Sequence, residues 1–340
     1  MNMLHSAELS SAVAGRPATF SLRHDPRRRS QRRAVFAWGV WVVCAWGLAL
    51  ACLEPAAAQT PPLPALGTSR FADSDGVSIH FVEAGEGPVV VLLHGFPDFH
   101  YTWRDQFPEL AKTHRVVALD LRGYHRSGQP EGVENYRMEK LVGDVSAVLR
   151  ELKCEKATIV GHDWGGAIAW SFAMQRPEQT ERLVVLNLPH PRGLIRELKS
   201  NPAQQANSAY ARGFQLPGAE KLLSAKALAG WVKEPEAQAQ YVAAFEKSSL
   251  PGMLNFYRAN YPREPYAEPA DLPPVRCPVL MIHGLDDQAL LPGALNDTWK
   301  WIENEFTLVT IPKAGHFVHR DRPAQVTRVL TEWLSRQSGS

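Results

Sequence analysis

Short apolar runs alternate with amphipathic stretches over residues 77–190. Runs rich in Val, Leu and Ile predict strands, whereas apolar residues that recur every three or four positions predict helices. The expected strands are 77–85, 87–95, 114–123, 157–163 and 181–189, and the expected helices are 102–112, 138–152 and 167–177. Because apolar strands that alternate with helices build a sheet covered on both faces, this pattern predicts an α/β fold with a mostly parallel sheet.

The alternation stops between about Pro191 and Pro274, where the chain is rich in Ala, Gln and Leu with helical periodicity and has no strand-like run. It then resumes with strands at 277–284 and 306–312 and helices at 297–304 and 323–334. A helical insertion between two parts of an α/β sheet is typical of a lid. We therefore expect a core over residues 68–190 and 273–340 and a helical cap over residues 191–272.

The first 58 residues have the pattern of an export signal. An arginine-rich stretch precedes the uncharged apolar run Ala34–Leu53, and Ala56 and Ala58 then offer a small-residue cleavage site. We expect a signal over residues 1–58, cleaved after Ala58, and a Pro-rich linker over residues 59–67. The prediction is therefore a periplasmic or secreted protein.

Two alternatives for this segment stay open. The apolar run has roughly the 20 residues needed to cross a bilayer, so it could instead remain as an uncleaved anchor. The sequence "SQRRAVF" loosely resembles a twin-arginine signal but lacks the preferred Phe-Leu order. Each alternative still places the rest of the chain outside the cytoplasm, and the membrane is expected as a partner only through this segment.

The basic excess of the chain comes from the same segment. The formal net charge is +2, but seven of the 37 basic residues and only three of the 35 acidic residues lie before Gln59. The remainder has 30 basic and 32 acidic residues. Because nucleic-acid binding needs a clustered basic face, no nucleic-acid partner is expected.

Two of the four cysteines, Cys154 and Cys277, lie in the expected mature chain. Each directly precedes a predicted strand, and a third strand is expected between those two. The separation of about 10 Å, two strand spacings, is too large for a disulfide. We therefore expect two free thiols.

The stretch "ATIVGHDWGGAIAW" joins a predicted strand to a small-residue helix through Asp163. A side chain on such a tight strand-to-helix turn is exposed at the carboxyl end of the sheet, and the turn needs small neighbours such as Gly161 and Gly165. The better-known version of the turn carries serine. An aspartate at the same place predicts a nucleophile that forms an ester with carbon, which activated water must then hydrolyse.

The residues that would activate this water follow later strands. His316 follows the last strand and is the expected base, with His319 as a competitor. Asp287 is expected to orient the imidazole and is preferred to Asp286. The other position for this third residue, near the end of the strand predicted over 181–189, holds Asn187, which carries no charge.

Backbone amides are the expected oxyanion donors. The residue after the nucleophile, Trp164, and Phe96 in "HGFP" occupy the two positions that supply these donors in such folds. His94 is expected to brace this loop by hydrogen bonding.

With these pieces assembled, the chain resembles the α/β-hydrolase superfamily and, within it, the epoxide hydrolases. The resemblance covers about residues 68–336 and rests on "HGFPDFHYTW", "DLRGYHRSGQP", "GHDWGG" and "AGHFVHRDRP". It implies an eight-stranded, mostly parallel sheet with a helical cap. His125 departs from the commonest pattern, which has a second glycine at that position.

The same resemblance implies that two cap tyrosines donate hydrogen bonds to the epoxide oxygen. "SAYARGFQLPG" and "LNFYRANY" match the two tyrosine segments and point to Tyr210 and to Tyr257 rather than Tyr261. Phe96, Pro97, Trp164 and Phe214 are then expected to line the substrate pocket. The implied reactants are a small apolar epoxide and water, with no cofactor and no metal, and the sequence leaves the oligomeric state open.

Two rival functions remain. A haloalkane or haloacetate dehalogenase uses the same Asp-His-Asp arrangement, but the resemblance to those families is weaker. Haloalkane dehalogenases usually have a halide donor in place of Phe96, and fluoroacetate dehalogenases have arginines in place of Trp164 and Ala167. A non-catalytic exported binding protein with this fold is a lesser alternative, because such a protein is expected to have lost Asp163, His316 or Asp287.

Overall fold

The computed structural model describes residues 65–268 and 271–336. The export signal expected over residues 1–58 lies outside these ranges, as does most of the expected linker. None of the helices within the described ranges is long and apolar enough to cross a membrane.

A single eight-stranded sheet forms the centre of the described structure, in the order β1-β2-β4-β3-β5-β6-β7-β8. Strand β2 pairs antiparallel with β1 and β4, and the remaining pairs are parallel. The strands are β1 (Thr68–Ser74), β2 (Val77–Ala84), β3 (Val89–Leu93), β4 (Arg115–Leu119), β5 (Ala157–His162), β6 (Thr180–Leu186), β7 (Val279–Gly284) and β8 (Phe306–Ile311). The mostly parallel eight-stranded sheet predicted from the sequence is confirmed.

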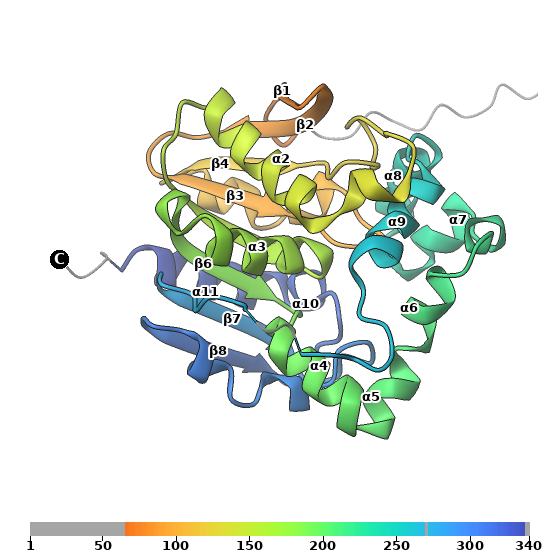
Figure 1. Cartoon of the computed structure of the whole chain (residues 1–340). Helices are drawn as coiled ribbons and strands as arrows, with labels where there is room; N and C mark the ends of the chain where they lie inside the picture. Colours follow the sequence, from red (N-terminus) through yellow and green to blue (C-terminus); the bar gives the residue numbers. More distant parts are fainter. Residues whose placement is uncertain (1–64, 269–270, 337–340) are drawn as a thin grey trace, which may run out of the picture. The chain divides into compact units, whose positions relative to one another are not determined.

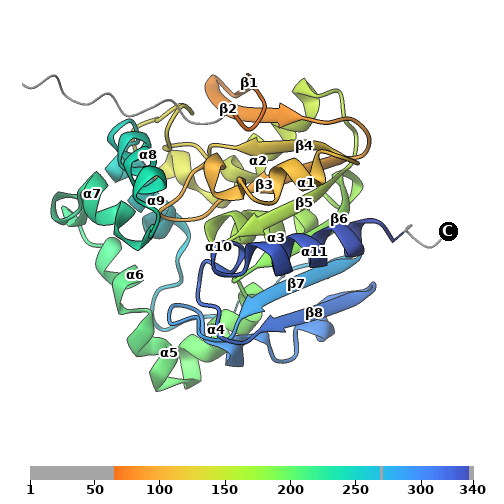
Figure 2. The same cartoon turned by 180° about the vertical axis from the view of Figure 1, so that it is seen from behind.

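Helices cover both faces of this sheet. Figure 1 shows α2 and α3 on one face, and Figure 2 shows α1, α10 and α11 on the other. The core helices are α1 (Phe107–Leu110), α2 (Met138–Glu151), α3 (Trp164–Gln175), α10 (Val318–Asp321) and α11 (Pro323–Leu334). The helices between β6 and β7 are α4 (Pro191–Ser200), α5 (Pro202–Asn207), α6 (Ala209–Phe214), α7 (Ala225–Leu228), α8 (Pro235–Glu246) and α9 (Leu250–Asn260).

Alternation of side chains along each strand divides the core into two layers. In β3, Val91 and Leu93 pack in the layer that contains α2 and α3, while Val90 and Leu92 pack in the layer that contains α1 and α11. Successive residues of a strand point to opposite faces, so a strand buried on both sides is apolar throughout. The first layer continues into the cap through residues of α9 such as Met253.

One strand was missed, and two predicted helices were wrong. Strand β1 was not predicted, because its exposed first residues do not form an apolar run. An ion pair of 2.7 Å between Arg70 and Glu83 helps to hold this edge strand against β2. Residues 297–304 form a 3-10 turn at Thr298–Trp301 instead of a helix, and Asp297 before it has a left-handed backbone. The helix expected over 102–112 is divided into a 3-10 turn, His100–Trp103, and the short α1.

The two cysteines of the described structure are free thiols. Cys154 precedes β5 and Cys277 precedes β7, and β6 lies between these strands in the sheet. The arrangement is therefore the one that the strand pattern predicted.

Candidate active site

Asp163 lies at the sharp turn between β5 and α3. Its backbone has φ 51° and ψ −121°, a region that non-glycine residues occupy only at an energetic cost. The flanking elements approach so closely that a Cβ at Gly161 would lie 2.1 Å from the Gly165 carbonyl oxygen. The turn therefore holds the Asp163 carboxylate at the carboxyl end of the sheet, where α/β proteins bind ligands.

His316 lies between two carboxylates, on the loop that joins β8 to α10. Its Nε2 is 3.5 Å from Oδ2 of Asp163, and its Nδ1 is 2.9 Å from Oδ2 of Asp287. The competing histidine, His319, instead forms a 2.7 Å hydrogen bond with Oγ1 of Thr102. The structure thus brings the three side chains predicted at the ends of β5, β7 and β8 into one chain of contacts.

Asn187 fixes the position of Asp287. Its Nδ2 donates to Oδ2 of Asp287 at 2.7 Å, and the amides of Ala289 and Leu290 donate to Oδ1 at 2.8 and 3.0 Å. Sequence reasoning considered Asn187 only as a replacement for the carboxylate. Its position directly after β6, next to β7 in the sheet, is the signal that could have identified it as a partner of that carboxylate.

The two carboxylates keep His316 protonated. Burial alone would lower the pKa of His316, but the charges and hydrogen bonds of Asp287 and Asp163 raise it to about 10. Burial likewise opposes the charge on Asp163, yet the hydrogen bond and charge of His316 lower the pKa of Asp163 below its usual value. The resting site therefore holds an anionic Asp163 beside a cationic His316.

A backbone amide holds the other oxygen of the nucleophile. The N–H of Phe96 donates to Oδ1 of Asp163 at 2.7 Å. His94 braces this loop: its Nε2 accepts from the N–H of Leu121 at 3.0 Å, and its Nδ1 lies 2.8 Å from the carbonyl oxygen of Gly95. Trp164, the second expected donor, is the first residue of α3, where a backbone N–H has no partner within the helix.

An apolar cavity of about 270 Å³ opens above Asp163. Asp163 and Trp164 line it from the core, and Tyr210 on α6 and Tyr257 on α9 line it from the cap. Most of the remaining lining is apolar and includes Leu194. The cap thus encloses the nucleophile in a space largely without charges.

The two cap tyrosines are neutral at ordinary pH. Burial and the neighbouring tyrosine hydroxyl and Asp163 charge raise the pKa of Tyr257 well above its usual value, and burial and Asp163 do the same for Tyr210. Tyr210 is 38% exposed as a whole residue, and burial is still the main cause that raises the pKa of its hydroxyl. The ring centroids of the two tyrosines are 6.2 Å apart. Both phenols can therefore donate hydrogen bonds into the cavity.

Of the four residues expected to line the pocket, Trp164 borders this cavity directly. Phe96 and Phe214 instead pack edge-on against the ring of Tyr257, with centroids 5.4 and 5.1 Å away. The carbonyl oxygen of Pro97 accepts a hydrogen bond from the indole of Trp231 at 3.3 Å. The two phenylalanines therefore support the position of the tyrosine ring.

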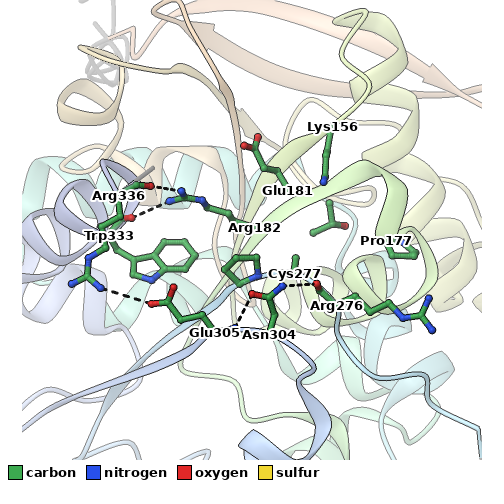
Figure 3. Close-up of a pocket in the computed structure, with 12 residues that line it drawn as sticks. Lys156, Pro177, Glu181, Arg182, Arg276, Cys277, Asn304, Glu305, Trp333 and Arg336 are labelled. Carbon is green, nitrogen blue, oxygen red and sulfur yellow. Dashed lines mark hydrogen bonds and ion pairs between the residues drawn. The ribbon is translucent and has the colours of Figure 1, made fainter. Parts of the chain in front are cut away.

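A second, larger cavity of about 550 Å³ lies at the opposite ends of the strands. Figure 3 shows residues that line it, among them Arg182, which points toward Trp333 and Arg336. Arg182 donates to the carbonyl oxygen of Trp333 at 3.0 Å and to that of Leu334 at 3.3 Å. A cation at a helix C-terminus satisfies unpaired carbonyls and complements the helix dipole, so Arg182 has a structural role there.

Comparisons with known proteins show which family the chain resembles. A family model described as the alpha/beta hydrolase fold matches residues 88–323. The chain is 34% identical to AB hydrolase superfamily protein YfhM of Bacillus subtilis, over 79% of this chain and 98% of that protein. It is 33% identical to epoxide hydrolase 4 of Homo sapiens, over 81% of each chain.

The chain is also similar to a solved structure of an epoxide hydrolase. A crystal structure of the Bacillus megaterium epoxide hydrolase in complex with an inhibitor aligns with a TM-score of 0.73 and 30% identity, over 78% of this chain and 100% of that one. The chain belongs to the epoxide hydrolase family of the α/β hydrolases. Membership of the epoxide hydrolase family confirms the fold and the enzyme class that the sequence motifs indicated.

Proposed function

We propose that the chain hydrolyses an epoxide to a vicinal diol through an aspartyl ester on Asp163. One observation carries this proposal: the Asp163 carboxylate and the neutral tyrosines Tyr210 and Tyr257 line the same apolar cavity. Opening of an epoxide needs a nucleophile for one carbon and a proton donor for the oxygen, because an alkoxide is a strongly basic leaving group. The cavity offers both kinds of group.

In the first step, Oδ2 of Asp163 attacks an epoxide carbon. A bond forms between this oxygen and the carbon, the ring C–O bond breaks, and the ring oxygen takes a proton from Tyr257 or Tyr210. The N–H of Phe96, 2.7 Å from Oδ1, keeps the other carboxylate oxygen in place. His316 can return a proton to the tyrosine. The Asp163 charge raises the pKa of His316, so the loss of that charge in the ester lowers this pKa.

In the second step, neutral His316 takes a proton from water, and the hydroxide attacks Cγ of Asp163. Negative charge then develops on Oδ1, where the Phe96 amide stabilises it. Collapse of this intermediate releases the diol, whose oxygen takes the proton from His316. The carboxylic acid left on Asp163 then gives its proton to His316, which restores the resting ion pair. Asp287 holds Nδ1 of His316 at 2.9 Å and so directs Nε2 toward the ester.

The shape and lining of the cavity support a small apolar substrate. A volume of about 270 Å³ is at the small end of typical ligand pockets. Among the described residues that line the cavity, none is a lysine, arginine or histidine that could bind a carboxylate. We therefore propose aryl or alkyl epoxides of the size of styrene oxide.

Product analysis tests this function. The wild-type protein should convert styrene oxide to phenylethanediol, and it should release no halide from 1-chlorobutane or fluoroacetate. Asp163→Ser is the matched control, which should keep the thermal unfolding midpoint within a few degrees and lose diol formation. Halide release without diol formation would favour a dehalogenase, and neither product would favour a binding protein.

We also propose that the chain acts outside the cytoplasm. The proposal rests on the arginines before the apolar run Ala34–Leu53 and on the Ala56-x-Ala58 site. Expression of the full chain in a bacterium, followed by fractionation and N-terminal sequencing, tests it. A periplasmic protein that begins at Gln59 is expected, whereas an uncleaved protein in the cytoplasm would contradict export.

A further inference from the structure

Three histidines and one aspartate meet outside the catalytic chain of contacts. His80 lies in β2, His100 in the turn His100–Trp103, and Asp120 and His125 in the segment after β4. Oδ2 of Asp120 is 2.7 Å from Nδ1 of His80 and 2.9 Å from Nδ1 of His125, and Oδ1 is 2.8 Å from Nδ1 of His100. We call these four residues the Asp120 cluster.

The donor atoms of the Asp120 cluster are close together and shielded from solvent. One nitrogen or oxygen from each of the four residues lies within 4.8 Å of the other three. His80 and Asp120 are fully buried, and the side chains of His100 and His125 are 7% and 9% exposed. Four ligand atoms from three segments of the chain thus converge on one small volume.

His125 enters the cluster from a strained backbone. Its φ is +42°, in the left-handed region that favours glycine, and its N–H donates to Oγ of Ser248 at 2.8 Å. Strain of this kind persists only where the surroundings fix it, and it concentrates at ligand-binding and catalytic sites. His125 takes no part in the proposed epoxide chemistry, so that chemistry gives no account of the strain.

We propose that the Asp120 cluster is a binding site for one divalent transition-metal ion, with Zn²⁺ as the representative ion. Three imidazoles and one carboxylate form a complete tetrahedral set for Zn²⁺. Metal–ligand bonds of about 2.0–2.2 Å would place the donor atoms roughly 3.4 Å apart. The three distances from Asp120 to the histidine nitrogens, 2.7, 2.8 and 2.9 Å, are shorter than this value, so these side chains must separate by several tenths of an ångström around the ion.

Coordination through Nδ1 requires each neutral imidazole to carry its proton on Nε2. For His80, this nitrogen lies 2.8 Å from Oγ of Ser69, which can accept a hydrogen bond from it. Arg126, an exposed residue, donates to the same oxygen at 2.7 Å and to Nε2 of His80 at 3.3 Å, so the second of these contacts must open when Nε2 carries the proton. A hydroxyl oxygen has two lone pairs, so Ser69 can accept from both groups.

A bound ion would connect segments that support the loop after β3, which carries Phe96. The N–H of Leu121, next to Asp120, donates to Nε2 of His94 at 3.0 Å, and His94 braces the loop that carries Phe96. The contact of His125 with Ser248 reaches the segment between α8 and α9. The ion is therefore expected to stabilise the fold at the junction of core and cap.

Metal titration of the chelator-treated full chain tests this site. Zn²⁺, followed with a competing chromophoric chelator and by elemental analysis, should bind with a stoichiometry of one and raise the thermal unfolding midpoint. His125→Gly removes one ligand and relieves the positive φ, so it should fold yet bind Zn²⁺ at least about 100-fold more weakly, because even partners outside the coordination shell cost 10- to 100-fold. His100→Gln should give the same loss independently.

Another buried group, Asp98, His162 and His319, is the necessary control because its ligand atoms also lie within 4.8 Å of one another. Oδ2 of Asp98 and Nδ1 of both histidines are without hydrogen-bond partners among the described residues. His319→Gln should leave the zinc stoichiometry unchanged. Absence of zinc binding by the wild type, unchanged binding by the two cluster variants, or loss of binding in His319→Gln would each overturn the proposal.

Discussion

Nε2 of His316 lies 3.5 Å from Oδ2 of Asp163, so the proposed base forms an ion pair with the proposed nucleophile. Burial alone would lower the pKa of His316. Asp287 and Asp163 both favour the charged imidazole, however, and raise this pKa to about 10. Conversion of Asp163 to a neutral ester removes one of these two charges. Alkylation of the nucleophile thereby prepares His316 to act as a base for the next step.

Replacement of His316 by glutamine should separate the two chemical steps. The Asp163 carboxylate remains able to open the epoxide, but no base is left to activate water, so the ester should accumulate. Intact-protein mass spectrometry after mixing with styrene oxide should show one covalent substrate per chain. The double variant Asp163→Ser/His316→Gln should show none; wild-type turnover by His316→Gln would exclude His316 as the base.

Asn187→Gly should slow hydrolysis of the ester and leave its formation nearly unchanged. Glycine suits the positive φ of 43° at this position, while the 2.7 Å hydrogen bond to Asp287 is lost. A hydrogen bond to a charged group is worth about 1.5–3 kcal/mol, which corresponds to roughly 10- to 100-fold in rate. Stopped-flow fluorescence under single turnover resolves the two steps, and equal slowing of both would indicate a structural defect instead of a positioning role.

Tyr257→Phe should slow ring opening by about 100-fold or less, because Tyr210 remains as a second donor. Tyr261→Phe is the matched control, since Tyr261 also lines the cavity but is not proposed to donate to the epoxide. The rate of ester formation measures the effect. If Tyr261→Phe lowers the rate of ester formation more than Tyr257→Phe does, Tyr261 is the proton donor instead.

Stability should depend on pH through His316. Its pKa is about 10 in the folded chain, against an ordinary value of 6.5, because the two carboxylates overcome the effect of burial. A raised pKa gives stabilisation that is complete below pH 6.5 and is lost as the pH rises through about 10. The difference in thermal midpoint between wild type and His316→Gln should therefore shrink from pH 6 to pH 10; a difference that grows would contradict the ion pair.

Most of the sheet could be predicted because its central strands, β3 to β7, are largely buried and mostly apolar. Strand β1 escaped prediction because this edge strand has mostly exposed residues and is held by antiparallel pairing with β2 and by the Arg70–Glu83 ion pair. The turn at Thr298–Trp301 escaped it because the local pattern resembles a helix, whereas the backbone of Asp297 is left-handed. Both errors come from contacts or conformations that periodicity does not encode.

The candidate site could be located because the strand order brings the ends of β5, β7 and β8 together, and the motifs mark Asp163, Asp287 and His316 on those ends. Asn187 was discounted because it has no charge. Its side-chain amide nevertheless donates a hydrogen bond to Asp287 and so fixes the position of that carboxylate. The Asp120 cluster depends on contacts between residues as distant as His80 and His125. Spacing along the chain carries no sign of such contacts.

The most direct test of the central claim is a single turnover of styrene oxide by excess protein in oxygen-18 water. If Asp163 forms an ester, the new oxygen of the first diol comes from its carboxylate, so the diol should be unlabelled. The peptide that contains Asp163 should then carry oxygen-18. A labelled first diol and an unlabelled Asp163 peptide would mean that water attacks the epoxide directly and would contradict the aspartyl-ester mechanism.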